Sequence, residues 1–154
     1  MKLLHFYFVA VIILISTISY SQTIVAYKNN DLSFGDVFIG YSENVEHTDP
    51  RAAKFNFYHT KFFFADLLLS FNLPKFLTNG KDKLPIEFDF NHAAWSNRDR
   101  TTGRNTINPN TPNELRRLFF YLPVYVWLGG KIQTNSTLSP GNYNGTITIT
   151  IEYL

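Results

Sequence analysis

The end of the chain alternates strictly between apolar and polar side chains. The apolar positions are Ile147, Ile149, Ile151 and Tyr153, and the residues between them are threonine or glutamate. Successive side chains of a β-strand point to opposite faces of its sheet, so this pattern predicts a strand with one buried face. The β-branched residues that fill the segment also suit a pleated surface.

Similar runs recur along the chain and are separated by turn signals. Alternating or continuous apolar runs occupy 53–58, 67–73, 84–90 and 122–128. Turn-forming clusters lie at 29–31, 48–50, 79–80, 129–130 and 139–142. About seven short strands punctuated by turns are typical of a β-sandwich or barrel, and we predict an all-β sandwich. A length of 154 residues fits one domain.

One segment interrupts the strand pattern. Residues 97–113 are rich in Asn, Thr, Arg and Pro, which predicts a long polar surface loop. The loop ends in a capping-box pattern from Thr111 to Glu114, with Pro112 at the first helical position. Leu115, Leu118 and the apolar residues after them have helical spacing, so we expect a short helix near 112–118. A strand that begins at Leu115 remains the alternative.

The N-terminus has the features of an export signal. Lys2 precedes an apolar run from Leu3 to Ile18, and small residues follow it. The run has 16 residues, fewer than the roughly 20 that a membrane-spanning helix needs. We therefore expect a signal peptide at 1–21, cleavage near Gln22, and a mature domain at 22–154 without a membrane span. The mature protein would act in the periplasm, at the cell surface or outside the cell.

The composition argues against several classes of function. The chain has 14 Lys and Arg against 12 Asp and Glu, which is too balanced for a typical nucleic-acid binder. It has no cysteine, so disulfides, thiolate metal sites and a cysteine nucleophile are excluded. There is no G-x-S-x-G motif, and His47, His59 and His92 do not have the spacing of a metal site. We predict a non-catalytic protein without a metal or cofactor.

Two sets of side chains are candidates for ligand binding. Arg98, Arg100 and Arg104 on the polar loop could hold a carboxylate or phosphate, although loop arginines are usually just solvated. Tyr125 and Trp127 alternate with aliphatic residues and could form a flat platform for a glycan. The alternative, which we favour, is that this second face is buried under the loop or another sheet, because large exposed apolar patches are rare.

The C-terminal segment also carries a resemblance. Gly141 to Leu154, with its Gly-x-Tyr turn and Thr/Ile strand, resembles the ending of spore coat protein U and of chaperone–usher pilins. Segments 32–37, 53–57 and 127–132 are similar, in order and spacing, to the bacterial family called domain of unknown function 4402. The resemblance implies an immunoglobulin-like sandwich with a structural or adhesive surface role and no catalysis. It implies that a periplasmic chaperone or a neighbouring pilin-like subunit docks on the strand at 147–153.

The N-terminal part departs from a polymerising pilin. Such a subunit donates an extension of alternating apolar residues to its neighbour's sheet. Only Gln22 to Asp31 precede the strand expected at Leu32, and their alternation is weak. A self-complete sandwich or a terminal subunit is therefore as good an interpretation. An extracellular carbohydrate-binding module and a small outer-membrane β-barrel remain as alternatives, although Glu152 and the threonines before Leu154 argue against the barrel.

Overall fold

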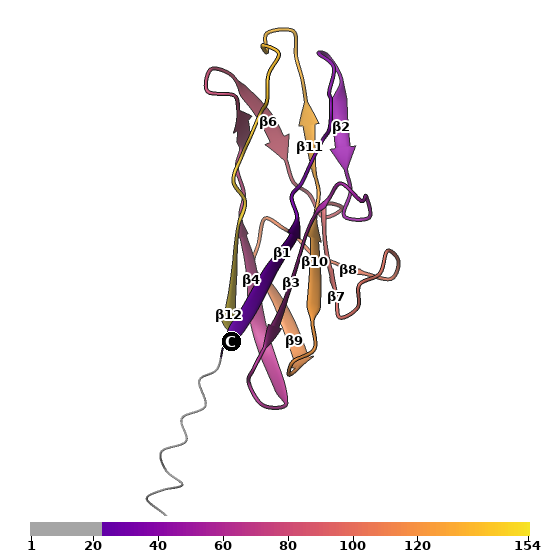
Figure 1. Ribbon diagram of the computed structural model, residues 1–154, viewed down its shortest axis with the longest axis vertical. Coiled ribbons are helices and arrows are strands. Elements are labelled where there is room, and N and C mark those ends of the chain that lie inside the picture. The colour runs from indigo at the N-terminus through magenta and orange to yellow at the C-terminus, as the bar shows by residue number, and fades with distance from the viewer. Residues whose placement is uncertain (1–22) are drawn as a thin grey trace, which may run out of the picture.

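A computed structural model describes residues 23–154 (Figure 1). This range contains twelve strands in three antiparallel sheets and no helix, so the predicted all-β sandwich is confirmed. Accordingly, no helix in the described range is long and apolar enough to cross a membrane. The predicted signal peptide at 1–21 lies outside the described residues.

The first sheet has the order β1-β3-β10-β7-β8. Its strands are β1 (Ile24–Asn30), β3 (Ala53–His59), β10 (Val124–Leu128), β7 (Ala93–Ser96) and β8 (Asn105–Thr106). The second sheet comprises, in order, β12 (Thr148–Tyr153), β4 (Phe64–Asn72) and β9 (Asn113–Phe119). The third comprises β2 (Ser42–Val45), β11 (Gly130–Gln133), β6 (Lys83–Glu87) and β5 (Phe76–Thr78).

Two apolar clusters hold the sheets together. The main cluster joins the first two sheets, and its fully buried members include Phe57, Leu67, Leu69, Leu115 and Leu128. A smaller cluster lies on the third sheet around Leu84, Ile86 and Ile132. Its cover is a set of partly buried side chains from irregular segments, including Leu32, Phe34 and Leu138. This part of the molecule is therefore less completely enclosed than the main cluster.

More strands are present than the seven expected, because long runs pass from one sheet to another. β10 and β11 are separated only by Gly129, whose N–H donates to His92 O at 2.7 Å. A Cβ at this position would lie 1.8 Å from Val45 O. Only glycine therefore permits the two backbones to approach this closely. In the same way, β4 and β5 are interrupted by a segment that contains Pro74.

The helix predicted near 112–118 is wrong, and the alternative of a strand is confirmed. The strand β9 pairs with β4, where Ala65 lies opposite Leu118 and Leu67 opposite Leu115. Two steps on β4 thus match three on β9, which is a β-bulge. Arg117 has a φ of 55°, and its N–H donates to Asp66 Oδ1 at 2.7 Å. The bulge buries two leucines three positions apart, a spacing that also suits a helix.

The N-terminal part also differs from expectation. Residues 24–30 form the full strand β1, which pairs with β3 from Ile24↔His59 onward. Leu32 to Val37, where the first strand was expected, contains no strand. This segment is held instead by a hydrogen bond from Ser33 N–H to Arg51 O at 3.0 Å.

Candidate functional site

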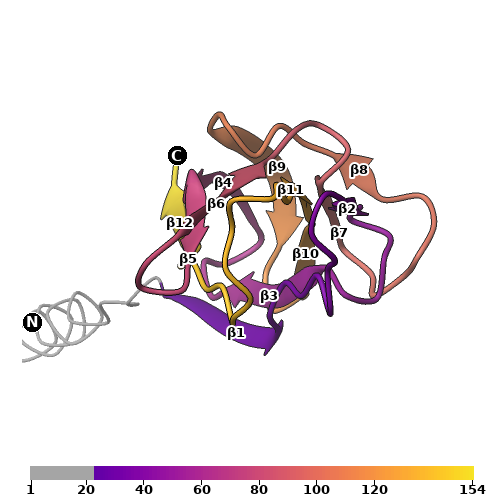
Figure 2. The same cartoon turned by 90° about the horizontal axis from the view of Figure 1, so that it is seen from above.

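An open groove of about 1130 Å³ runs between two sheet edges. One edge is β1, the outer strand of the first sheet, and the other is β12, the outer strand of the second. Figures 1 and 2 both place these strands on the same side of the molecule. Within the described residues, each pairs with only one neighbouring strand, β1 with β3 and β12 with β4.

The groove is lined largely by apolar side chains. Its floor includes residues of both clusters, namely Phe55, Leu84, Ile86, Leu128 and Ile132. Ile147, Ile149 and Ile151 line it from the side of β12 and the residue before that strand. Three of the four residues predicted for the docking strand therefore share one surface. Tyr153 does not line the groove. Its hydroxyl donates to Thr23 O at 3.3 Å, and its ring makes a T-shaped contact with the His59 ring.

A polar contact fixes the upper rim of the groove. Asp82 Oδ2 accepts the N–H of Ser139 at 2.8 Å and lies 3.4 Å from the Tyr143 hydroxyl. These hydrogen bonds lower the pKa of the Asp82 carboxyl, because they favour its charged form. The carboxylate thus holds the segment that leads into β12.

This geometry suits an extended peptide. The outer edge of a strand presents unpaired backbone N–H and C=O groups, which can pair with an added strand. An apolar floor can receive alternate side chains of that strand, since they all point to one face. The sequence predicted the β12 side of this site. It did not reveal the floor, which comes from strands distant in the chain.

Tyr125 and Trp127 do not form an open platform. Their rings stack 6.1 Å apart, but Trp127 is only 3% exposed. The Arg104 guanidinium lies 3.7 Å from the centre of the Trp127 ring, and Lys54 lies over both rings. The expectation of an exposed aromatic pair is therefore wrong for Trp127. The favoured alternative, burial under the loop or another sheet, is correct for Trp127, whereas Tyr125 is half-buried.

The guanidinium groups of two of the three loop arginines, Arg100 and Arg104, bind the protein's own polar groups. Arg104 donates through Nε to Arg100 O at 2.6 Å and through Nη1 to His47 O. Arg100 donates to Ser96 Oγ at 3.0 Å and to Gly103 O, whereas Arg98 contributes its backbone N–H to the same serine oxygen. Burial lowers the pKa of Arg104. The structure does not bring the three guanidinium groups together as an anion site.

The histidines serve local packing and hydrogen bonding. His59 Nε2 lies 2.8 Å from Leu118 O in the core. His92 Nδ1 accepts the N–H of Asp89 at 2.8 Å, so its Nε2–H donates to Asn44 Oδ1 at 2.8 Å. Burial lowers the pKa of His92 and of His47, which favours the neutral form of both rings. In residues 23–154 no three His, Asp or Glu side chains are grouped to hold a metal ion.

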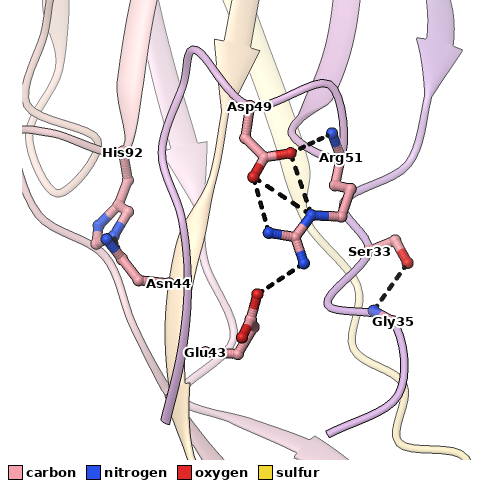
Figure 3. A network of polar contacts seen from close by, with 7 residues as sticks. All are labelled: Ser33, Gly35, Glu43, Asn44, Asp49, Arg51 and His92. Carbon is pink, nitrogen blue, oxygen red and sulfur yellow. Dashed lines mark hydrogen bonds and ion pairs between the residues drawn. The ribbon is translucent and has the colours of Figure 1, made fainter.

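The most connected polar cluster is built around Arg51 (Figure 3). Its guanidinium donates to Glu43 Oε1 at 2.7 Å and to Asp49 Oδ2 at 2.8 Å. This hydrogen bonding lowers the pKa of the Asp49 carboxyl. Both carboxylates are thus occupied by an internal cation, and the cluster ties β2 to the loop before β3.

No family model, no curated protein and no solved structure matches the chain.

Proposed function

We propose that this protein is an exported, non-catalytic, pilin-like component of the bacterial surface, with a structural or adhesive role. In this proposal the groove between β1 and β12 receives an extended segment of another chain. The observation that carries it is one open apolar groove flanked by two sheet edges that pair on one side only. The resemblance of residues 141–154 to pilin endings supports the same role.

The partner would be a periplasmic chaperone or a neighbouring pilin-like subunit. Either could add a strand whose alternate apolar side chains enter the groove. The chain's own segment at 24–30 already forms β1, so it is not free to leave without breaking the pairing with β3. We therefore expect this protein to accept a strand, and we do not expect it to donate this one.

The test uses the full chain, produced with its leader and recovered after export. Intact mass gives the N-terminus and shows whether cleavage occurs near Gln22. Light scattering then measures the oligomeric state before and after addition of a synthetic peptide of alternating valine and threonine. We expect saturable peptide binding, and we expect the peptide to dissociate any oligomer that forms through the groove. A compact monomer that does not bind the peptide would overturn the proposal.

Two variants on adjacent positions of β12 sharpen the result. I149D places a carboxylate in the groove, whereas T150D places one on the opposite, exposed face. We expect I149D to weaken peptide binding by at least about tenfold, since a buried unpaired charge is costly, and T150D to leave it unchanged. L138S changes the groove rim, and it is the second groove variant if I149D does not fold. Equal peptide affinities in L138S and T150D would contradict the assignment of the groove.

The carbohydrate-binding alternative has less support. It depended on Tyr125 and Trp127 as an open platform, and Arg104 covers the second ring. Glycan binding that persists in I149D and disappears in a Tyr125→Ala variant would revive it.

A further inference from the structure

A second apolar surface lies at the end of the molecule that is lowest in Figure 1. It is formed by the β3–β4 connection together with the turn between β9 and β10. We call it the aromatic tip, and its exposed members are Phe62, Phe63, Phe64, Phe119, Tyr121 and Leu122. None of these residues lines the groove.

The rings of the tip form one continuous surface. The Phe62 ring lies 4.0 Å from Phe63 and 5.7 Å from Phe120, and the Phe64 ring lies 5.4 Å from Phe119. The contacts thus join the two connections. Despite these contacts, Phe62 remains 69% exposed and Phe63 57% exposed. Burying them inside the fold would release more free energy than their mutual contacts do, so their exposure calls for an external partner.

The backbone of this end is strained. Phe63, Arg117 and Tyr121 have φ angles of 68°, 55° and 56°. Among residues 23–154, these are the only non-glycine residues in the left-handed region, and all three belong to the tip or its rim. Bulky side chains pay a steric cost there, and such strain concentrates where a protein binds something. Phe63 and Tyr121 combine this strained backbone with a side chain that is exposed to solvent.

Cations lie at the rim of the tip. Lys61 precedes Phe62 in the chain, and the Arg117 guanidinium lies 5.7 Å from the Phe64 ring. Neither forms an ion pair with a described residue. Glu114 pairs with Arg116, and Asp66 accepts the backbone N–H of Arg117, so Lys61, Arg116 and Arg117 face two nearby carboxylates. Lys61 Nζ lies 5.8 Å from the centre of the Tyr153 ring. An apolar centre with a small excess of cations at its rim is complementary to a bilayer with anionic headgroups.

The chain enters the fold at this same end. Thr60 N–H donates to Thr23 O at 3.0 Å, and Thr23 N–H donates to Thr60 Oγ1 at 2.9 Å. The first described residue therefore lies beside Lys61 and Phe62. Four residues separate the apolar run Leu3–Ile18 from Thr23, and the five chain steps between Ile18 and Thr23 span at most about 18 Å. A segment this short would keep the aromatic tip close to any bilayer that holds the apolar run.

We propose that the aromatic tip inserts into the headgroup region of a lipid bilayer, with Lys61 and Arg117 beside anionic phosphates. Phe and Leu side chains bury at the boundary between headgroups and acyl chains, and the Tyr121 hydroxyl suits the headgroup level. The contact is with one leaflet and does not span the membrane. It does not depend on what fills the groove, so either proposal can fail alone.

The experiment uses a tryptophan reporter in the full chain, produced with its leader and recovered after export. L122W places the reporter in the tip, where Leu122 is 51% exposed. Y41W is the matched control, because it lies in the turn before β2 at the opposite end in Figure 1. Vesicles contain phosphatidylethanolamine and phosphatidylglycerol, or phosphatidylcholine alone. We expect a blue shift and quenching by brominated lipid for L122W on the anionic vesicles, and neither for Y41W, whether or not the leader has been removed.

Binding variants give a second readout by co-sedimentation. F62S with F63N removes two rings, and asparagine tolerates the left-handed backbone at the second position. We expect vesicle affinity to fall by more than about tenfold. F38S with Y41S removes comparable apolar area from the opposite end and should have no effect. K61Q and R117N should each weaken binding to anionic vesicles about fivefold, and added salt should reduce that difference.

Three results would overturn the proposal. The first is the absence of a lipid-dependent shift in L122W. The second is an equal response of L122W and Y41W, which would indicate non-specific adsorption. The third is a shift in L122W that grows with protein concentration without lipid, because the tip would then bind a second copy of the chain.

Discussion

Replacement of Gly129 by alanine tests how the long strand passes from the first sheet to the third. The added Cβ would lie 1.8 Å from Val45 O, whereas real Cβ contacts are essentially never shorter than 3.0 Å. The atom that it meets is a backbone oxygen, so a change of side-chain rotamer cannot relieve the clash. The strands must separate where Gly130 pairs with Val45, and the hydrogen bond from Gly129 N–H to His92 O must lengthen.

The two effects set the expected magnitude. Overpacking in a well-packed site costs about 1–3 kcal/mol, and loss of a buried hydrogen bond costs about 1 kcal/mol. We therefore expect G129A to lower the free energy of unfolding by about 2–4 kcal/mol. With an m-value of about 2 kcal/mol/M, the urea midpoint would fall by about 1–2 M.

The measurement is urea unfolding followed by tryptophan fluorescence, with G141A as the matched control. At Gly141 the nearest atom to an added Cβ is Asn79 Nδ2, at 3.3 Å, so the end of that side chain has to shift by only a few tenths of an ångström. We expect the control to change the free energy of unfolding by less than about 0.5 kcal/mol. If G129A were as stable as the parent, the strands could separate without cost, and the close approach would not explain the glycine.

Two further predictions concern buried polar groups. Burial lowers the pKa of His47 and His92 below the ordinary value of 6.5, so near this pH the unfolded chain binds more protons than the folded one. The urea midpoint should therefore decrease as the pH is lowered from 7.5 to 5.5, and a midpoint that stays constant would contradict neutral buried rings. H92Q should flatten this dependence, because it removes one of the two groups. R104Q should expose Trp127 and increase the acrylamide quenching of tryptophan fluorescence, whereas R98Q should leave quenching unchanged because the Arg98 side chain does not cover the ring. Equal quenching in both variants would show that Arg104 does not cover Trp127.

The segment at 113–119 shows where local patterns mislead. Thr111 to Glu114 has the composition of a helix start, and the spacing of Leu115 and Leu118 continues a helical face. In the fold, β4 lies between β12 and β9, and its backbone groups require a partner on each side. Pairing across a bulge at Arg117 satisfies them and still buries both leucines.

The aromatic residues of β10 show the limit of burial predictions. Its residues are apolar on both faces, which leaves open whether Tyr125 and Trp127 are exposed. The answer depends on Arg104, which lies 23 positions before Trp127 in the chain. A charged side chain from a mainly polar loop thus provides the cover for a buried indole.

Alternation of side chains was enough to predict the all-β class and strands such as Ala53–His59 and Thr148–Tyr153, because side-chain period is a local property of the backbone. It also placed Ile147, Ile149 and Ile151 on one face. The fold was needed to show that this face borders an open groove, that an arginine covers Trp127, and that two connections join in the aromatic tip. Each of these depends on contacts between residues far apart in the chain, which no local pattern encodes.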